Sequence, residues 1–232
     1  MHWPRVSMIF YIWLSVIKPL SVVTRINVKQ TEIEVKKSIV IIWLILLFSA
    51  IGALFWYNEW VYHLPTPIPK NYKPVDQGKL IKLSGALEAD HSKPLFLHFF
   101  NPDCPCSRFN ISNFKLLVKQ YGRQVKFVII VMNNKFYTAK QIQDKFDLDV
   151  PVLFDASIAV SCGVYSTPQA VLLDAGHKLY YRGNYNSSRY CTDEKTSFAK
   201  IAIAGLLNNH ARLVFNPLAL RAYGCSLPNC KR

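Results

Sequence analysis

The chain has 232 residues, of which 51% are hydrophobic and 18% charged, and its formal net charge is +14. This composition excludes an intrinsically disordered chain, which needs low hydrophobicity and high charge, and nine glycines exclude a collagen-like one. The lysines and arginines are scattered and do not form a basic helix face with interleaved aromatics, so we expect no nucleic-acid partner and a basic surface beside anionic lipid.

Residues 38–57 are the first predicted element, a run of twenty residues without a charge. As a helix this run would span about 30 Å, the thickness of a bilayer core, and its end at Trp56 and Tyr57 is typical of a membrane interface. Lysines precede the run, so the positive-inside rule places residues 1–37 in the cytoplasm. We therefore expect an uncleaved, single-pass anchor in the inner membrane, with a periplasmic C-terminal domain. Whether the short apolar stretch 8–17 also enters the membrane stays open.

Residues 58–77 contain four prolines and no periodic apolar pattern, which predicts an extended tether. Strand and helix signals then alternate over residues 78–210. The pattern predicts strands at 94–100, 124–132 and 150–154, a hairpin of 168–174 and 178–183, and helices at 107–121 (ended by Gly122), 138–146, 157–164 and 193–208 (with Thr192 as N-cap). This order predicts an α/β domain in which helices cover both faces of a mixed central sheet.

Cys104 is the sharpest chemical signal, because it stands where the strand 94–100 ends and the next helix begins. A thiolate at that place is stabilised by the positive end of the helix dipole and by free backbone N–H groups, and Arg108 adds positive charge. Such surroundings lower the thiol pKa below about 8.5 and make the sulfur a nucleophile. We therefore expect an exposed and reactive Cys104 sulfur.

The stretch FFNPDCPCS, which ends at Ser107, resembles the thioredoxin-like superfamily, most closely its membrane-anchored redoxins of the TlpA type. Placed on the family motif F-W-x-x-W-C-x-x-C, Cys104 falls on the attacking cysteine, Ser107 on the resolving cysteine and Asp103 on a tryptophan. Thr167-Pro168 matches the family's cis-proline, which faces the attacking cysteine. The resemblance covers about residues 80–210 and implies a thioredoxin-like fold and thiol–disulfide exchange with proteins.

The motif departs from the family because it reads C-P-C-S. Cysteines two residues apart at a helix start point in diverging directions, so a Cys104–Cys106 disulfide would be strained and oxidising. Either this pair cycles as a disulfide, or Cys104 acts as a single thiol that another cysteine resolves. Cys162 could also be a buried apolar residue, and the C-terminal extension 211–232 could close a loop of its own. The candidates for a resolving or structural disulfide are Cys162, Cys225 and Cys230.

Three functions therefore stay open. The first is a membrane-tethered, extracytoplasmic thiol–disulfide oxidoreductase without a cofactor, which forms mixed disulfides with periplasmic or membrane proteins through Cys104. The second is a redox-inactive binding module, favoured by the missing second cysteine. The third is a Cu(I)-binding or delivery module, because close thiolates suit this soft ion. The similar copper chaperones, however, use C-x-x-x-C and a histidine near the cis-proline loop, where this chain has no histidine. His98 is expected to be a core residue, not a ligand.

Overall fold

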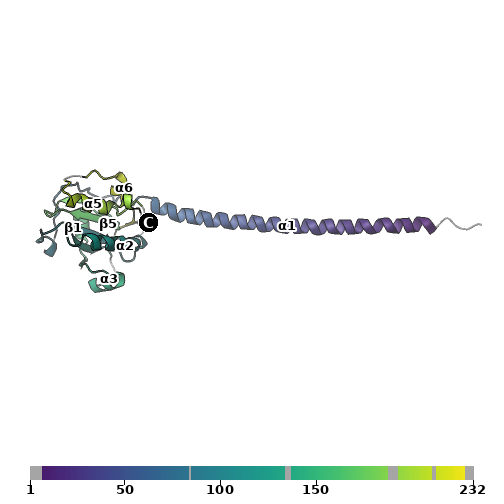
Figure 1. The fold of residues 1–232 in the computed structure, drawn as a ribbon, viewed down its shortest axis with the longest axis horizontal. Helices are drawn as coiled ribbons and strands as arrows, with labels where there is room; N and C mark the ends of the chain where they lie inside the picture. The colour runs from purple at the N-terminus through teal and green to yellow at the C-terminus, as the bar shows by residue number, and fades with distance from the viewer. Residues whose placement is uncertain (1–6, 84, 134–136, 188–192, 211–212, 228–232) are drawn as a thin grey trace, which may run out of the picture. The chain divides into compact units, whose positions relative to one another are not determined.

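The structure, a computed structural model, describes residues 7–83, 85–133, 137–187, 193–210 and 213–227. The chain divides into two compact units, residues 1–59 and 60–232. A single helix, α1 (Ser7–His63), accounts for the described part of the first unit and also includes residues 8–17 (Figure 1). Within it Thr31–Asn58 is long and apolar enough to cross a bilayer, and this stretch contains the predicted span 38–57.

The second unit is built around a five-stranded sheet in the order β3-β2-β1-β5-β6. β1 runs parallel to β2 and antiparallel to β5, which makes the sheet mixed. The central strand β1 is buried along its whole length, as expected for a mostly apolar run in the middle of a covered sheet. The strands of this sheet are β1 (Leu95–Phe100), β2 (Lys126–Val131), β3 (Val152–Leu153), β5 (Gln169–Leu173) and β6 (Leu179–Gly183).

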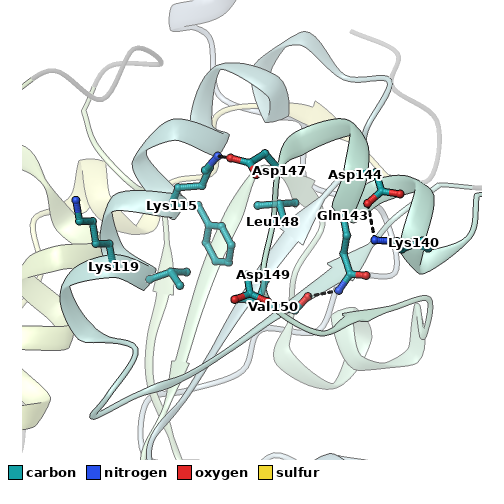
Figure 2. Close-up of a pocket in the computed structure, with 11 residues that line it drawn as sticks. Lys115, Lys119, Lys140, Gln143, Asp144, Asp147, Leu148, Asp149 and Val150 are labelled. Carbon is teal, nitrogen blue, oxygen red and sulfur yellow. Dashed lines mark hydrogen bonds and ion pairs between the residues drawn. The ribbon is translucent and has the colours of Figure 1, made fainter.

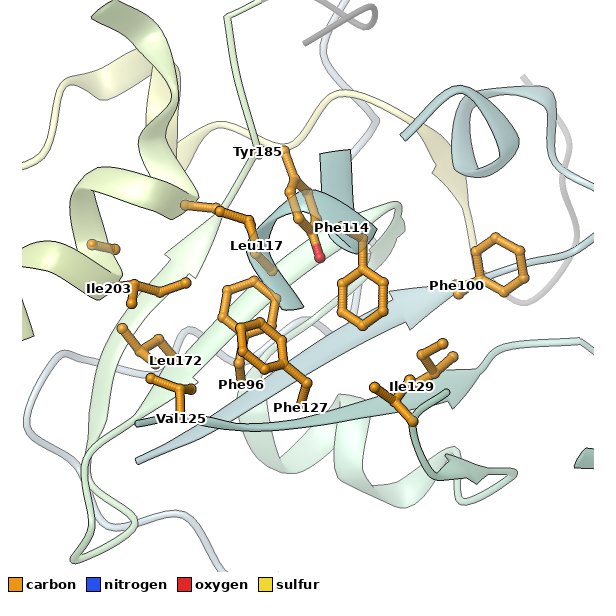
Figure 3. Close-up of a cluster of buried hydrophobic side chains, with 14 of the residues drawn as sticks. Phe96, Phe100, Phe114, Leu117, Val125, Phe127, Ile129, Leu172, Tyr185 and Ile203 are labelled. Atoms are coloured by element: carbon orange, nitrogen blue, oxygen red, sulfur yellow. The ribbon is translucent and has the colours of Figure 1, made fainter. Parts of the chain in front are cut away.

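Two apolar cores lie on the two faces of this sheet, because side chains alternate along each strand. Phe96 and Phe100 of β1 belong to one core, which also takes residues from α2, α3 and α5 (Figure 3). Leu97 and Phe99 belong to the other core, which takes residues from α4. Helices therefore cover both faces of the mixed sheet, and the predicted α/β fold class is confirmed. The helices are α2 (Pro105–Tyr121), α3 (Ala139–Phe146), α4 (Ser157–Cys162) and α5 (Phe198–Leu207).

Some predicted boundaries are wrong for local reasons. α2 begins two residues earlier than predicted, since Pro105 is well suited to the first helical position. The predicted helix 193–208 is divided into a 3-10 turn, Glu194–Thr196, and α5, and the backbone of Ser197 between them is not helical. The N-cap predicted at Thr192 lies outside the described residues.

The proline-rich segment 58–77 is not a free tether over its whole length. Helix α1 continues to His63, and several later residues of the segment bind the domain. Thr66 is buried, and Gln77 donates a hydrogen bond to the carbonyl of Tyr180 at 2.7 Å. Val75 packs against the apolar core, and the Tyr72 ring contacts that of Tyr165.

The C-terminal extension also packs onto the domain. It contains a short helix, α6 (Pro217–Leu220), and a two-residue strand, β7 (Cys225–Ser226). β7 pairs with β4 (Ser166–Thr167), and the two strands form a second small sheet. Two residues are too few for a periodic signal, so the sequence did not predict this pairing.

Candidate active site

Cys104 is the N-cap residue of α2, as the strand-to-helix position predicted. Its backbone is extended (φ −84°, ψ 122°), and its carbonyl accepts the first helical hydrogen bond, from the N–H of Arg108 at 3.2 Å. Its own N–H donates to the carbonyl of Asn101 at 3.1 Å, which closes the turn after β1. The cysteine is thus held at the positive end of a 17-residue helix.

Cys104 forms a disulfide with Cys225, which is 121 residues further along the chain. Cys104 is therefore bonded to a cysteine outside the C-P-C motif and not to Cys106. The prediction of a loop closed by a Cys225–Cys230 disulfide is wrong, because Cys225 is bonded to Cys104. Cys191 and Cys230 lie outside the described residues. The predicted exposure of Cys104 is also wrong here. Its exposed fraction is 0%, since the C-terminal segment that carries Cys225 covers it.

Pro168 lies beside this disulfide. The Thr167–Pro168 peptide bond is cis, as the resemblance implied. Thr167 pairs with Cys225 in the β4–β7 ladder, so the residue before the cis-proline is adjacent to the cysteine bonded to Cys104. The expected juxtaposition of Cys104, Thr167 and Pro168 is therefore present, and a strand of the same chain completes it.

Cys106 lies within this group, although it is not part of the disulfide. The Sγ atoms of Cys104, Cys106 and Cys225 all lie within 4.8 Å of one another, and all three residues are buried. Together they form a small cluster separate from the two large cores. Three sulfurs at this spacing can exchange disulfides and, when reduced, can bind a soft metal ion.

The supporting residues of the motif shape the turn before α2. Ser107 is buried, and its hydroxyl accepts a hydrogen bond from the N–H of Asn101 at 3.2 Å, which fixes the turn between β1 and α2. The Asp103 carboxylate accepts hydrogen bonds from Asn133 (2.9 Å) and Tyr137 (2.8 Å), which tie the turn to the segment after β2. Arg108 is exposed on the first turn of α2.

Cys162 is a residue of the apolar core. It is fully buried on α4, among the apolar side chains of one sheet face. Burial raises the pKa of its thiol to about 12, so almost no thiolate forms at neutral pH. This supports the reading of Cys162 as a small buried apolar residue.

Thr66 and Gly224 also belong to the site, although no sequence motif predicts them. The Thr66 hydroxyl donates to the carbonyl of Gly224 at 3.1 Å and lies 3.0 Å from Ser166 Oγ. Its N–H donates to the carbonyl of Ala222 at 2.8 Å. The Gly-Cys pair at 224–225 is the one sequence signal near these residues, and no local pattern links residue 66 to it.

A hollow of about 570 Å³ lies elsewhere in the domain, between α2 and α3 (Figure 2). Its charged residues are largely paired with one another, for example Lys115 with Asp147 and Lys140 with Asp144. None of the three clustered cysteines and neither Thr167 nor Pro168 lines it. The hollow is therefore not part of the candidate site.

Residues 74–227 match a family model described as "Domain of unknown function (DUF6436)". The chain belongs to this family. The matched range includes both partners of the disulfide and the cis-proline of this DUF6436 protein, so the family domain extends into the C-terminal segment. No curated protein matches the chain.

Solved structures share the fold at low sequence identity. A hypothetical protein from Sinorhizobium meliloti 1021 is 19% identical, with a TM-score of 0.56 over 68% of this chain and 96% of that one. An uncharacterized conserved protein from Geobacillus kaustophilus is 18% identical, with a TM-score of 0.52 over 70% and 97%. A thiol:disulfide interchange protein of the thioredoxin family from Chlorobium tepidum TLS is 17% identical, with a TM-score of 0.43 over 58% and 99%.

Proposed function

We propose that this protein is a membrane-tethered, extracytoplasmic thiol–disulfide oxidoreductase in which Cys104 attacks and Cys225 resolves. The observation that carries the proposal is the Cys104–Cys225 disulfide beside the cis Thr167–Pro168 bond. Two cysteines 121 residues apart are joined at the start of a helix that stabilises a thiolate, a combination that suits exchange.

The proposed reaction is thiol–disulfide exchange. The Cys104 thiolate attacks one sulfur of a substrate disulfide, so a mixed disulfide forms and the other substrate sulfur leaves as a thiolate. The Cys225 thiolate then attacks Cys104 Sγ, which releases the second substrate sulfur and closes the Cys104–Cys225 bond. Two electrons pass from the protein to the substrate, and a dithiol protein must return them before the next cycle. The same steps in reverse oxidise a substrate dithiol.

Helix α1 supports the proposed place of action. The apolar stretch Thr31–Asn58 would anchor the chain in the inner membrane, and the lysines before it favour a cytoplasmic N-terminus. The domain would then face the periplasm, where disulfides persist. Its partners would be thiols and disulfides of periplasmic or membrane proteins close to the bilayer.

A turnover assay on the full chain in detergent tests this function. A disulfide-linked fluorescent peptide and a dithiol reductant serve as substrates, and the release of fluorescence is followed. Cys104→Ala should lower the rate by at least about 10³-fold, because removal of a nucleophile abolishes covalent catalysis. Cys162→Ala, a matched change of a buried cysteine, should leave the rate unchanged. Equal rates for wild type and Cys104→Ala would refute the function.

Cu(I) binding is a second candidate function, favoured by the three-sulfur cluster. An ion bonded to three sulfurs at about 2.3 Å separates them by about 4 Å. The three Sγ atoms lie within 4.8 Å of one another, and the bonded sulfurs of Cys104 and Cys225 would move apart to this separation after reduction. Among the described residues no histidine or carboxylate joins Cys104, Cys106 and Cys225, and three thiolates suit Cu(I) better than four-coordinate zinc. Binding would require the disulfide to be reduced first by a dithiol.

Titration of the reduced full chain with Cu(I) against a chromogenic chelator tests this candidate. Wild type should bind one ion per chain. Cys106→Ala and Cys225→Ala should each weaken binding by more than the roughly 10–100-fold that loss of an outer-shell partner costs. Cys162→Ala should have no effect. Unchanged affinity in Cys225→Ala would exclude a three-sulfur site.

A further inference from the structure

The strand that carries Cys225 is held at the site by its backbone. β7 adds to β4 in antiparallel register, with Thr167 opposite Cys225 and Ser166 opposite Ser226. The ladder continues in a hydrogen bond from the N–H of Leu227 to the carbonyl of Tyr165 at 3.3 Å. Main-chain pairing of this kind accepts any extended chain, and side-chain pockets then decide which sequence fits.

The position before Cys225 accepts only glycine. A Cβ atom built on Gly224 would overlap the carbonyl oxygen of Thr167 and would lie 2.8 Å from Ser166 Oγ. Carbon atoms do not approach backbone oxygen so closely, and a backbone atom of a paired strand cannot easily move aside. The glycine is therefore required by lack of space on the β4 side.

Thr66 closes the other side of the same stretch. Its hydroxyl and its N–H donate to the carbonyls of Gly224 and Ala222, respectively. Thr66, Ser166 and Thr167 are all buried, with exposed fractions of 5% or less. Residues 222–225 thus run through a slot between β4 and Thr66, and Cys104 Sγ lies at its end.

We infer that this slot is the substrate site and that residues 222–227 occupy it as an internal substitute. The inference rests on the proposed function and adds the substrate class: an extended polypeptide with glycine directly before its reactive cysteine. Such a segment takes the place of β7, pairs with β4 and presents its sulfur to Cys104. In the oxidised protein the slot is filled, and reduction of the Cys104–Cys225 bond removes the covalent link that holds β7 in it.

The first test compares two peptides on the reduced full-length Cys225→Ser variant, in which Cys104 has lost its partner Cys225. The peptides, Ala-Tyr-Gly-Cys-Ser-Leu and Ala-Tyr-Val-Cys-Ser-Leu, carry the same aromatic thiol as leaving group. The rate of mixed-disulfide formation on Cys104 is followed by release of that thiol. The glycine peptide should react at least about tenfold faster, since overpacking at this position disfavours the valine peptide.

The second test frees the slot. In Gly224→Val/Cys225→Ser the internal strand no longer fits, so the glycine peptide should react about tenfold faster than with Cys225→Ser alone. Gly224→Val could also disturb folding, and the peptide comparison does not depend on it.

The outcomes separate this inference from the proposed function. Equal rates for the two peptides, both far above those of Cys104→Ala/Cys225→Ser, would overturn the slot and leave thiol–disulfide exchange in place. Absence of reaction with either peptide and with a small disulfide such as cystine would overturn the proposed function. A faster glycine peptide supports the slot.

Discussion

Replacing Cys225 with alanine should leave substrates covalently bound to Cys104. In wild type the Cys225 thiol is returned to Cys104 by the pairing of β7 with β4, which places it beside the cis-proline. A tethered group acts at an effective concentration in the millimolar range or above, so with external thiol at ~0.01 mM resolution should slow by roughly 10²-fold or more. Acid quenching, alkylation of free thiols and mass spectrometry during a single turnover measure the lifetime of the mixed disulfide.

Cys106→Ala is the informative comparison for this result. Cys106 belongs to the same sulfur cluster but is not bonded to Cys104, so its loss should change the lifetime of the mixed disulfide far less. If the mixed disulfide instead persists in Cys106→Ala and resolves normally in Cys225→Ala, then Cys106 is the resolving residue. The observed disulfide would in that case be structural.

Acid should destabilise the domain through the buried imidazole of His98. The imidazole is fully buried and stacked on Phe114, and its Nδ1 lies 2.7 Å from the Tyr185 hydroxyl. Its Nε2 has no hydrogen-bond partner among the described residues. Burial disfavours the charged ring and lowers the pKa of His98 to about 3, against an ordinary value of 6.5.

The sign of the effect follows from where the proton binds. Between pH 6.5 and pH 3 the unfolded chain takes up a proton at His98 and the folded chain does not, so the free energy of unfolding falls as the pH falls. The slope approaches ~1.4 kcal/mol per pH unit below pH 6.5, which amounts to roughly 2.3 kcal/mol between pH 6.5 and pH 4.5. The contribution becomes constant about one pH unit above the unfolded pKa.

Urea unfolding of the full chain at a series of pH values measures this slope. His98→Gln keeps an acceptor for the Tyr185 hydroxyl and removes the titrating group, so its slope over the same window should be smaller by about 1.4 kcal/mol per unit. Proton NMR of the imidazole gives a measurement that does not depend on the variant. Titration of His98 near pH 6.5 in the folded protein would contradict the prediction.

The proline-rich segment 58–77 contributes a residue to the candidate site. Thr66 lies only three residues after the end of α1 and contacts both β4 and the strand that carries Cys225. The connection between the apolar helix and the domain therefore supplies one wall of the slot. A tether that was only a spacer would not need a buried threonine.

Much of the fold could be predicted from local patterns. The apolar run Pro94–Phe100 predicted the buried central strand, and the capping box at Thr138 marks the start of α3 where the sequence predicted a helix. Cys104 at a strand end and Thr-Pro at a later strand start predicted two of the parts that meet at the site. Each of these signals lies within a few residues of the element that it predicts, because strands and helices bury one face or both with a fixed period.

The partner of Cys104 was decided by tertiary structure alone. Cys225 lies 121 residues away, in a two-residue strand whose formation depends on β4, Thr66 and the missing side chain of Gly224. A strand of two residues is too short to produce a periodic pattern in the sequence. Its pairing with β4 forms only when the fold has placed residues 166–168 beside the start of α2. Single residues of the site, such as Cys104 and Pro168, could therefore be predicted from local sequence. The disulfide between Cys104 and Cys225 could not, because it depends on contacts between segments far apart in the chain.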